Sequence, residues 1–533
     1  MSSFFKLEAR IAKRRRTAPL FASAFGAIVS LGMLAGCFWS AQPKGEGGAP
    51  SVAIGSEAST STPIGNLAAR YTSERPKESG FALITSGREA YLELTSLVSV
   101  AEKTLDLQYY IWRADTTGRE LFEAILRAAE RGVRVRLLLD DMDLSWADNA
   151  LEKLGALPNL EIRIFNPFSG RETGLVDLVF DYRRVNHRMH NKVFVVDNSI
   201  AVLGGRNVGD QYFSNNEEGN YRDLDLYAVG PIVRAVSASF DDFWNSPWSI
   251  PIRSIDGEKS EPITFADAYR TLRREDTGAK QPRDDLEDAR AHPEQRVKRA
   301  LNKLIWTEKA ELLVDRADKP ATAESELLKE ARAELKGTLR RDLLLETAYL
   351  IPGDDGVERL CRRVRDGIRV RILTNSFTSN DVITAYAGYR KFREPLLRCG
   401  VELYEMRADA GFVKTEWNWA KPTSSAYLHT KAAVLDMHDV IVGSFNMDPR
   451  SIKFNTEIAL LVRSPQLAKE VADFIEGGME ISNAYRLSLE DGEIVWLGDV
   501  DGETKHLYDE PGGDVWRWVV SKVLSLLPIE GQL

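Results

Sequence analysis

One pattern of apolar and polar positions occurs twice in the body of the chain, at a long interval. The segment 132–139 (Gly-Val-Arg-Val-Arg-Leu-Leu-Leu) returns at 367–374 as Gly-Ile-Arg-Val-Arg-Ile-Leu-Thr. Each copy follows a helix-like segment, and each helix-like segment follows an apolar run typical of a strand. The helix-like segments are 121–131 and 357–366, and the apolar runs are 105–112 and 343–351. Strand, helix and strand in this order predict an α/β protein with two related halves.

A shorter motif occurs once in each half. The sequence His-x-Lys-x-x-x-x-Asp is present as His190, Lys192 and Asp197, and again as His429, Lys431 and Asp436. A glycine turn that ends in asparagine follows each motif, at 204–207 and 443–446. Two matches in the same order at equivalent places predict that the motifs act as a pair.

The spacing within the motif predicts that its aspartate has a different role from its histidine and lysine. The β-branched segment 193–196 predicts a strand, and Asp197 then begins a turn. Because alternate side chains of a strand share a face, His190 and Lys192 point the same way and Asp197 leaves that face. The second motif repeats this geometry. We therefore expect histidine and lysine to act together and each motif aspartate to stabilise its turn.

These residue types suit phosphodiester transfer, which needs a nucleophile, an acid for the leaving group and positive charge for the phosphoryl oxygens. Histidine titrates near neutral pH and serves both proton transfer and attack. The motif lysines supply positive charge, and Asn207 and Asn446 are candidate phosphate-binding residues. Since two lysines neutralise a phosphate and no zinc-spaced cluster occurs, we expect no metal and no cofactor.

A carboxylate commonly fixes the tautomer of a catalytic histidine. Asp223 and Glu457 lie at similar distances beyond the two motif histidines and are the candidates, with Asp225 as a competitor of Asp223. The spacing leaves open which carboxylate serves which histidine.

The paired motifs resemble those of the phospholipase D superfamily, and more of the chain is similar to its bacterial C-type cardiolipin synthase branch. The similar stretches are 107–112, 165–168, 188–192, 204–207 and 526–530, so the resemblance runs from about residue 80 to the C-terminus. It implies a phospholipase D fold, in which two α-β-α sandwich halves pack as one pseudo-twofold catalytic unit.

The resemblance also implies a reaction. His190 would attack phosphorus to give a phosphohistidine, and His429 would protonate the departing alcohol and then activate the incoming one. In that branch the phosphatidyl group passes from one phospholipid to the headgroup hydroxyl of phosphatidylglycerol, which gives cardiolipin. We therefore expect phospholipid substrates, phosphatidylglycerol and phosphatidylethanolamine, and the sequence leaves open which lipid is the donor. The alternatives are a phospholipase D that uses water, a nuclease, and a non-enzymatic lipid-binding envelope protein.

Composition bears on these alternatives. The net charge of −9 over 533 residues lacks the basic footprint of a nucleic-acid binder, so we expect no nucleic-acid partner. The halves are predicted at 67–250 and 336–486, with a charged, partly helical surface connector at 251–335. Residues 487–533 form a predicted extension whose amphipathic helix, 514–533, faces either a bilayer or the domain.

The N-terminus has the layout of an export signal. A basic cluster at 13–16 precedes an uncharged run that ends in Leu-Ala-Gly-Cys, with Cys37 as the lipid-anchor candidate. This predicts a lipoprotein signal at 1–36 and a flexible tether at 37–66, with an uncleaved membrane anchor as the alternative. The protein would face the periplasm at a membrane surface, and Phe38 favours the outer membrane. Cys361 and Cys399 are expected to be small buried side chains, or else a disulfide.

Overall fold

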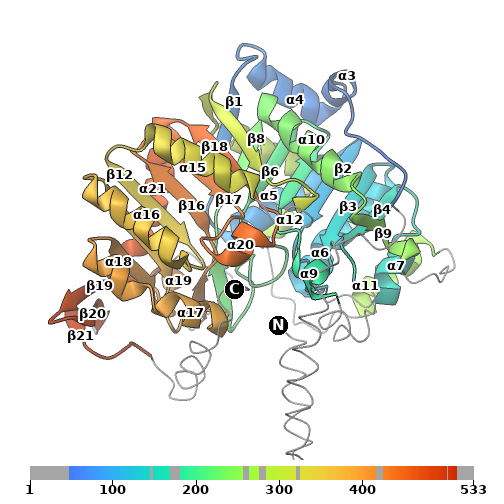
Figure 1. The fold of residues 1–533 in the computed structure, drawn as a ribbon. Helices are drawn as coiled ribbons and strands as arrows, with labels where there is room; N and C mark the ends of the chain where they lie inside the picture. Colours follow the sequence, from blue (N-terminus) through green and yellow to red (C-terminus); the bar gives the residue numbers. More distant parts are fainter. Residues whose placement is uncertain are drawn as a thin grey trace, which may run out of the picture.

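The computed structural model describes residues 47–144, 148–168, 181–255, 263–274, 284–319, 325–415, 424–500 and 502–512. Within these ranges the chain forms two large mixed sheets that lie side by side, each with helices on its faces (Figure 1). The signal, Cys37 and the helix expected at 514–533 lie outside the described residues. No helix in the described part of the chain is long and apolar enough to cross a bilayer.

The first sheet has the strand order β10-β1-β8-β6-β5-β2-β3-β4-β9. Its strands are β1 (Ser79–Ile84), β2 (Thr104–Tyr109), β3 (Arg134–Asp140), β4 (Leu160–Phe165), β5 (Val193–Val196), β6 (Ile200–Gly204), β8 (Asp225–Val229), β9 (Ser249–Pro251) and β10 (Ile305–Thr307). The pairs β2–β3 and β3–β4 are parallel, and the other pairs are antiparallel.

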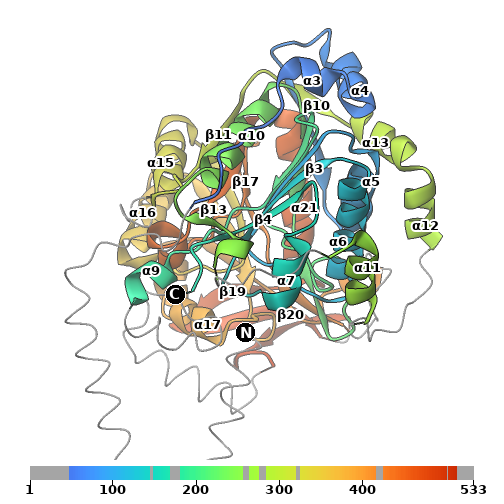
Figure 2. The same ribbon diagram turned by 90° about the vertical axis from the view of Figure 1, so that its right-hand side faces the viewer.

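Helices cover both faces of this sheet. The outer layer consists of α5 (Gly87–Val100), α6 (Thr116–Glu130), α7 (Asp148–Leu154), α11 (Phe265–Arg274), α12 (Asp284–Ala291) and α13 (Pro293–Leu301). Figure 2 shows most of these helices on one side of the molecule. Helix α10 (Pro231–Trp244) packs on the opposite face, and the short elements α9 (Tyr182–Asn186) and η2 (Ile252–Ser254) flank the sheet.

The second sheet repeats this arrangement, with the strand order β11-β18-β17-β16-β12-β13-β14-β19-β20-β21. Its strands are β11 (Ala310–Val314), β12 (Asp342–Thr347), β13 (Arg369–Asn375), β14 (Glu402–Met406), β16 (Lys431–Leu435), β17 (Asp439–Gly443), β18 (Ile458–Arg463), β19 (Ala484–Glu490), β20 (Glu493–Val500) and β21 (Glu503–Leu507). Its helices are α15 (Glu326–Thr338), α16 (Gly353–Arg365), α17 (Ile383–Arg390), α18 (Arg393–Arg398), α19 (Phe412–Thr415), α20 (Pro449–Lys453) and α21 (Pro465–Met479). The six strands β18 to β14 match β8 to β4 in order and direction, so the duplication predicted from the repeat is confirmed.

A shared apolar core joins the halves. Val195 of β5, Val236 of α10, Val434 of β16 and Val471 of α21 all belong to one buried cluster. Each sheet therefore has its own helices on one face and contributes to a common layer on the other. The predicted class, two α-β-α sandwiches packed as one unit, is the observed fold.

The repeated glycine explains why the passage from helix to strand is the same in both halves. Gly132 and Gly367 follow α6 and α16 with φ of +100° and +85°, a conformation that favours glycine. The amide of the next residue reaches back to end the helix in each case, from Val133 to Ala128 and from Ile368 to Arg363. The chain then enters β3 or β13 at the same register.

The predicted flexible tether at 37–66 is wrong for its described part. Residues 56–66 include α3 (Ser56–Thr60) and the start of α4 (Pro63–Thr72). Just before them, the Ser51 carbonyl accepts a hydrogen bond from Arg136 at 2.9 Å, and the Ala49 carbonyl accepts one from Arg163 at 2.6 Å. Both arginine side chains are 1% exposed, so this extended segment satisfies donors that would otherwise be buried without partners.

The connector and extension are also more integrated than predicted. The connector 251–335 adds β10 to the first sheet and β11 to the second, because the apolar side chains of Ile305 and Leu313 are buried there. The predicted boundary at 486 falls inside β19, and the extension continues the second sheet as β20 and β21. Of the two states expected for Cys361 and Cys399, the structure shows the disulfide, which joins α16 to the end of α18.

Candidate active site

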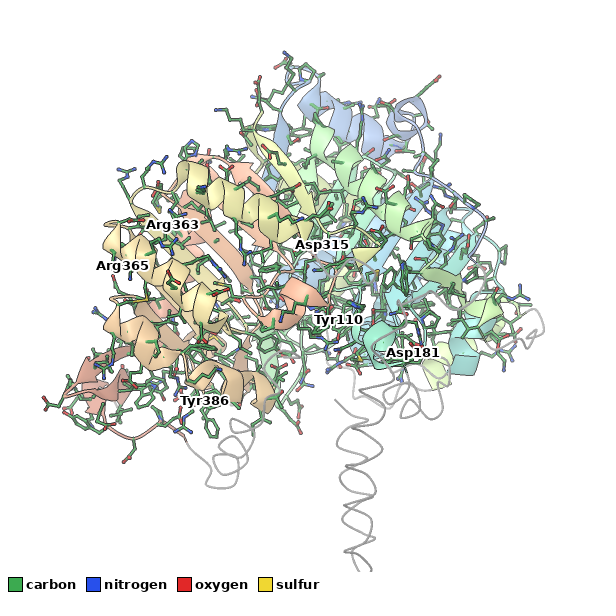
Figure 3. The ribbon with its side chains drawn as sticks, viewed as in Figure 1. Tyr110, Asp181, Asp315, Arg363, Arg365 and Tyr386 are labelled. Atoms are coloured by element: carbon green, nitrogen blue, oxygen red, sulfur yellow. A yellow bond between two sulfur atoms is a disulfide. The ribbon has the colours of Figure 1, made fainter. Side chains whose placement is uncertain are left out.

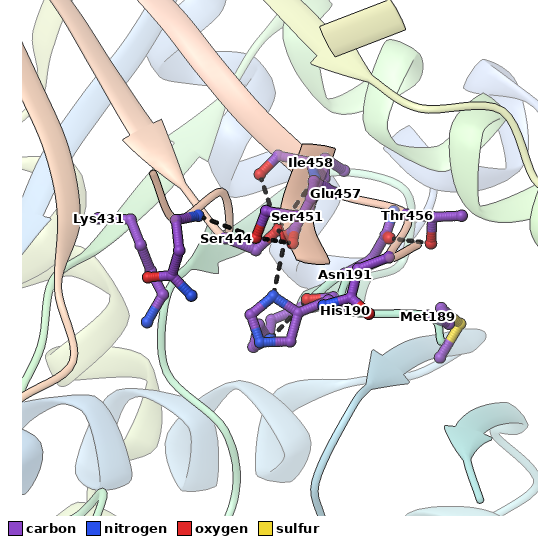
Figure 4. Close-up of polar contacts among 12 residues, drawn as sticks. Met189, His190, Asn191, Lys431, Ser444, Ser451, Thr456, Glu457 and Ile458 are labelled. Atoms are coloured by element: carbon purple, nitrogen blue, oxygen red, sulfur yellow. Dashed lines mark hydrogen bonds and ion pairs between the residues drawn. The ribbon is translucent and has the colours of Figure 1, made fainter. Parts of the chain in front are cut away.

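The first motif histidine sits where the two halves exchange backbone hydrogen bonds. Met189 bridges to Thr456, and the His190 amide donates to the Thr456 carbonyl at 2.9 Å. The His190 Nδ1 then lies 2.8 Å from Oε2 of Glu457, which belongs to the other half (Figure 4). Asp140, at the end of β3, accepts a hydrogen bond from the Met189 amide at 2.8 Å and so fixes the backbone just before His190.

The second motif histidine is held reciprocally. Strand β15 (Ser425–Leu428) pairs in parallel with β7 (Gly219–Arg222) of the first half. The His429 amide donates to the Arg222 carbonyl at 2.8 Å, and His429 Nδ1 lies 2.6 Å from Oδ2 of Asp223. The question left open by the sequence is thereby answered: each histidine is paired with the carboxylate of the opposite half.

The two carboxylates occupy equivalent positions but differ in their surroundings. Glu457 accepts hydrogen bonds from the hydroxyl groups of Ser444 and Ser451. Gly205 occupies the position equivalent to Ser444, and a Cβ there would lie only 2.3 Å from Asp223 Oδ1. Glycine thus provides the space for the shorter carboxylate, whereas serine supplies a donor to the longer one.

The connector also supports Glu457. The Glu457 amide donates to Asp315 Oδ2 at 3.1 Å, and the Asp315 amide donates to the Glu457 carbonyl at 3.0 Å. Figure 3 shows Asp315 and Tyr110 near the boundary between the halves. A segment predicted to be a surface connector therefore fixes the backbone of a residue that orients His190.

Both carboxylates are held in the ionised form. Burial alone would raise the pKa of Asp223, but His429, Lys431 and Arg206 lower it to about 2. Burial opposes ionisation of Glu457 too, yet His190, Lys192 and the Ser444 hydroxyl lower its pKa. Each anion therefore accepts the Nδ1–H of a neutral imidazole, which leaves Nε2 as the free lone pair.

The charge of each motif lysine acts on the histidine of the other motif as well as on its own. Burial lowers the pKa of His190 to about 4, and the ammonium groups of Lys192 and Lys431 add to this effect against Glu457. Burial and then Lys431 lower the pKa of His429 to about 3, with a further contribution from Lys192. Each histidine is thus affected by the lysine of the other motif, so both rings are neutral near pH 7.

The motif lysines are buried together. Each Nζ donates to the carbonyl of the histidine two residues earlier, at 2.5 Å for Lys192 and His190. Burial lowers the pKa of Lys192 well below its usual range. The Glu457 carboxylate opposes this effect, and repulsion by the Lys431 ammonium adds to it. A site with two such donors favours a ligand that brings negative charge.

The motif aspartates lie away from the histidines, in turns. Asp197 accepts from the amides of Glu102, Lys103 and Thr104, and Asp436 accepts from those of Arg340, Arg341 and Asp342. Their φ angles are +48° and +53°. Each carboxylate therefore ties its turn to the first residues of β2 or β12, which is the structural role that the spacing predicted.

The two asparagines that follow the motifs differ in their hydrogen bonds. Asn207 Oδ1 accepts from the Ile111 amide at 3.2 Å, and its Nδ2 donates to the Tyr212 hydroxyl at 3.1 Å. Asn446 Oδ1 is buried without a hydrogen-bond partner in the described structure. Asn207 is therefore held by the protein through both ends of its amide, whereas Asn446 keeps one unpaired acceptor, which suits a ligand hydroxyl and not a phosphate oxygen.

Aromatic side chains around the histidines were not predicted. The Tyr110 ring lies edge-on to His190 at 4.8 Å between centroids, and the ammonium of Lys192 is 5.2 Å from the same ring. On the other side, Tyr212 and Tyr221 lie 5.3 and 5.2 Å from His429. Tyr110 directly follows β2, and its position at the carboxyl end of a strand, where the functional residues of α/β sheets gather, was the available signal.

A duplicated α/β fold in which two His–Lys pairs face one another with reciprocal carboxylates defines a phosphodiester-transfer protein of the phospholipase D superfamily. Comparison with known proteins narrows this class. The chain belongs to the family described as "Cardiolipin synthase, PLD-like domain", whose model matches residues 94–244 and 333–477.

Individual relatives agree with this assignment. The chain is 36% identical over 480 residues to cardiolipin synthase C of Escherichia coli (strain K12), covering 86% of this chain and 97% of that protein. It is 25% identical to a cardiolipin synthase of Alkalihalophilus pseudofirmus, covering 76% of this chain and 67% of the relative. The crystal structure of phosphatidylserine synthase from Haemophilus influenzae Rd KW20 matches the fold with a TM-score of 0.52 at 14% identity, over 88% of this chain and all of that one.

Proposed function

We propose that the protein is a phosphatidyltransferase that makes cardiolipin from phosphatidylglycerol and a second phospholipid, such as phosphatidylethanolamine. The observation that supports this most is the reciprocal pairing of His190 with Glu457 and of His429 with Asp223, beside two buried lysines. The site has two neutral imidazoles and two cations, which are the groups needed to move a phosphoryl-linked group between two alcohols.

In this proposal His190 Nε2 attacks the donor phosphorus, and the bond from phosphorus to the headgroup oxygen breaks. His429, once protonated, donates its proton to the departing alkoxide. Its low pKa is that of the site without ligand, and the negative charge of a bound phosphodiester favours the protonated form. A hydroxyl of phosphatidylglycerol then loses its proton to His429 and attacks the phosphohistidine, which restores His190.

The proposal is tested with vesicles of phosphatidylglycerol and phosphatidylethanolamine and separation of the product lipids. Cardiolipin is expected from the full chain, and phosphatidic acid alone would indicate hydrolysis instead. The His429→Asn variant is expected to accumulate labelled phosphohistidine and the His190→Asn variant none. His438→Asn, at an exposed histidine, is the matched control. Absence of any product or adduct in the unaltered protein would reject the proposal.

We infer also that the protein is anchored to the cell envelope through an acylated Cys37, with the catalytic halves on the periplasmic side. The disulfide between Cys361 and Cys399 supports an oxidising compartment. In bacteria labelled with radioactive palmitate, the Cys37→Ala variant should lose the label, while Cys399→Ala should keep it. Retention of the label by Cys37→Ala would reject the anchor.

A further inference from the structure

The backbone and the ring of His429 are held by two consecutive residues of the other half. The Arg222 carbonyl accepts a hydrogen bond from the His429 amide at 2.8 Å, and the Asp223 carboxylate lies 2.6 Å from Nδ1 of the ring. The same carbonyl also accepts from the amide and the hydroxyl of Thr430, each at 3.2 Å. The position of His429 therefore depends on where the backbone of Arg222 lies.

The side chain of Arg222 is inserted into the second half. Its Nε donates to Oε1 of Glu346 on β12 at 3.1 Å, and its Nη2 donates to the Phe474 carbonyl on α21. The guanidinium also lies 3.7 Å from the centroid of the Phe474 ring, and the arginine and glutamate side chains are 6% and 0% exposed. A Cβ at Gly478 would lie 3.1 Å from Nη2, a tight approach that glycine avoids. An ion pair, a hydrogen bond and an aromatic ring thus fix the guanidinium and offset the cost of burying its charge.

The His190 side is held by a shorter side chain. Thr456 precedes Glu457 as Arg222 precedes Asp223, and its carbonyl accepts from the His190 amide at 2.9 Å. The Thr456 hydroxyl donates to Oδ1 of Asn191 at 2.8 Å, directly beside the histidine. An arginine that reaches a strand and a helix of the opposite half therefore supports His429, whereas a threonine that contacts the adjacent residue supports His190.

We propose that Arg222 is a positioning residue for His429 and controls the steps in which a proton passes to or from an alcohol. The inference rests on the proposed function, in which His429 is the acid and base and His190 is the nucleophile. A general acid must lie within hydrogen-bond reach of the departing oxygen, and a displacement of about 1 Å can cost about 100-fold in rate. Because the His190 backbone is held by Thr456, its attack should not depend on Arg222 when the leaving group needs no proton.

The test compares two donors in single-turnover formation of the labelled phosphohistidine. Phosphatidylethanolamine releases a strongly basic alkoxide, which needs a proton, whereas phosphatidyl-p-nitrophenol releases a weakly basic phenolate, which does not. Arg222→Lys keeps a positive charge beside Glu346 but loses the planar fork, and it should slow the adduct from the ethanolamine donor by about 10-fold. The double variant Arg222→Met with Glu346→Gln leaves no buried carboxylate without its partner, and it should slow that adduct by about 100-fold. With the nitrophenol donor, the rates of both variants per folded protein should stay within about twofold of the unaltered protein.

Arg136→Lys is the matched control, because Arg136 is also buried, pairs with Asp106 at 2.7 Å and lies 4.8 Å from the centroid of the Phe240 ring. It should lower the free energy of unfolding and leave both adduct rates of the folded protein unchanged. Equal slowing with both donors in the Arg222 variants would show a structural role alone and overturn the proposal. Unchanged rates with both donors would overturn it as well.

If the unaltered protein forms no adduct from either donor, the proposed function fails, and hydrogen exchange then decides the positioning role. In Arg222→Lys the amide of His429 should exchange at least about fivefold faster than in the unaltered protein, since its acceptor is less firmly held. The peptide that contains His190 should keep its exchange rate. Equal exchange at His429 in the two proteins would overturn the inference.

Discussion

The reciprocal carboxylates can be tested by the substitution Glu457→Gln, which keeps the shape of the side chain and removes its charge. The Glu457 side chain is fully buried and lies 2.8 Å from Nδ1 of His190. When His190 becomes positively charged during transfer, charge centres about 4 Å apart attract by about 4 kcal/mol at an effective dielectric constant of about 20. Loss of that attraction corresponds to a rate reduction of about 1,000-fold.

The assay is single-turnover formation of the labelled phosphohistidine, measured beside steady-state cardiolipin synthesis. If His190 is the nucleophile, Glu457→Gln should slow adduct formation itself. Glu405→Gln is the matched control, because Glu405 is also buried, pairs with Arg393 at 2.7 Å and lies outside the site. It should lower the free energy of unfolding and leave the adduct rate of the folded protein unchanged. An adduct rate for Glu457→Gln within about threefold of the unaltered protein would refute the reasoning, since it leaves less than about 1 kcal/mol for the pair.

Three further predictions concern pH, the disulfide and the motif aspartates. Because the nucleophile must be neutral and the pKa of His190 is lowered to about 4, the rate of the first transfer should fall on the acid side only below about pH 5, and an acid-side loss centred near pH 6.5 would contradict the burial of the ring. The disulfide closes a separation of 38 residues, so replacing both cysteines by alanine should lower the free energy of unfolding, measured in urea, by about 4 kcal/mol without changing kcat; equal stability would show that the bond does not form. Asp436→Ala removes the acceptor of three backbone amides and should destabilise the protein by about 2–4 kcal/mol, while a loss of kcat in the folded fraction would make Asp436 more than a turn residue.

The elements that the sequence predicted correctly are those set by local pattern. Gly132 and Gly367 mark the ends of helices because a left-handed residue is needed there, and period-two spacing separates each motif aspartate from its histidine. These features depend on a few consecutive residues. They were sufficient to predict two related α/β halves and two His–Lys pairs.

The features that the sequence did not predict are contacts between distant segments. Glu457 lies 267 residues from His190, and Asp223 lies 206 residues from His429, so no local spacing could assign either pair. The same holds for the connector, whose three-residue strand β10 and five-residue strand β11 take their place from the distant strands β1 and β18 with which they pair. The segment at 49–51 was predicted to be flexible because its composition is poor in apolar residues, whereas buried arginines of the first half hold it in place.

The reciprocal arrangement has a consequence for how the two halves diverged. Neither half alone contains an oriented histidine, because the carboxylate that fixes each ring comes from the other half. A substitution at Gly205 or Ser444 therefore acts on the histidine of the opposite half through Asp223 or Glu457, since a Cβ at Gly205 would clash with Asp223 and the Ser444 hydroxyl donates to Glu457. The two halves must retain their relative placement for chemistry, yet each can change its own side of the site. His429 is flanked by the stacked rings of Tyr212 and Tyr221 and His190 by the ring of Tyr110, a difference expected when one histidine handles the alcohols and the other holds the phosphorus.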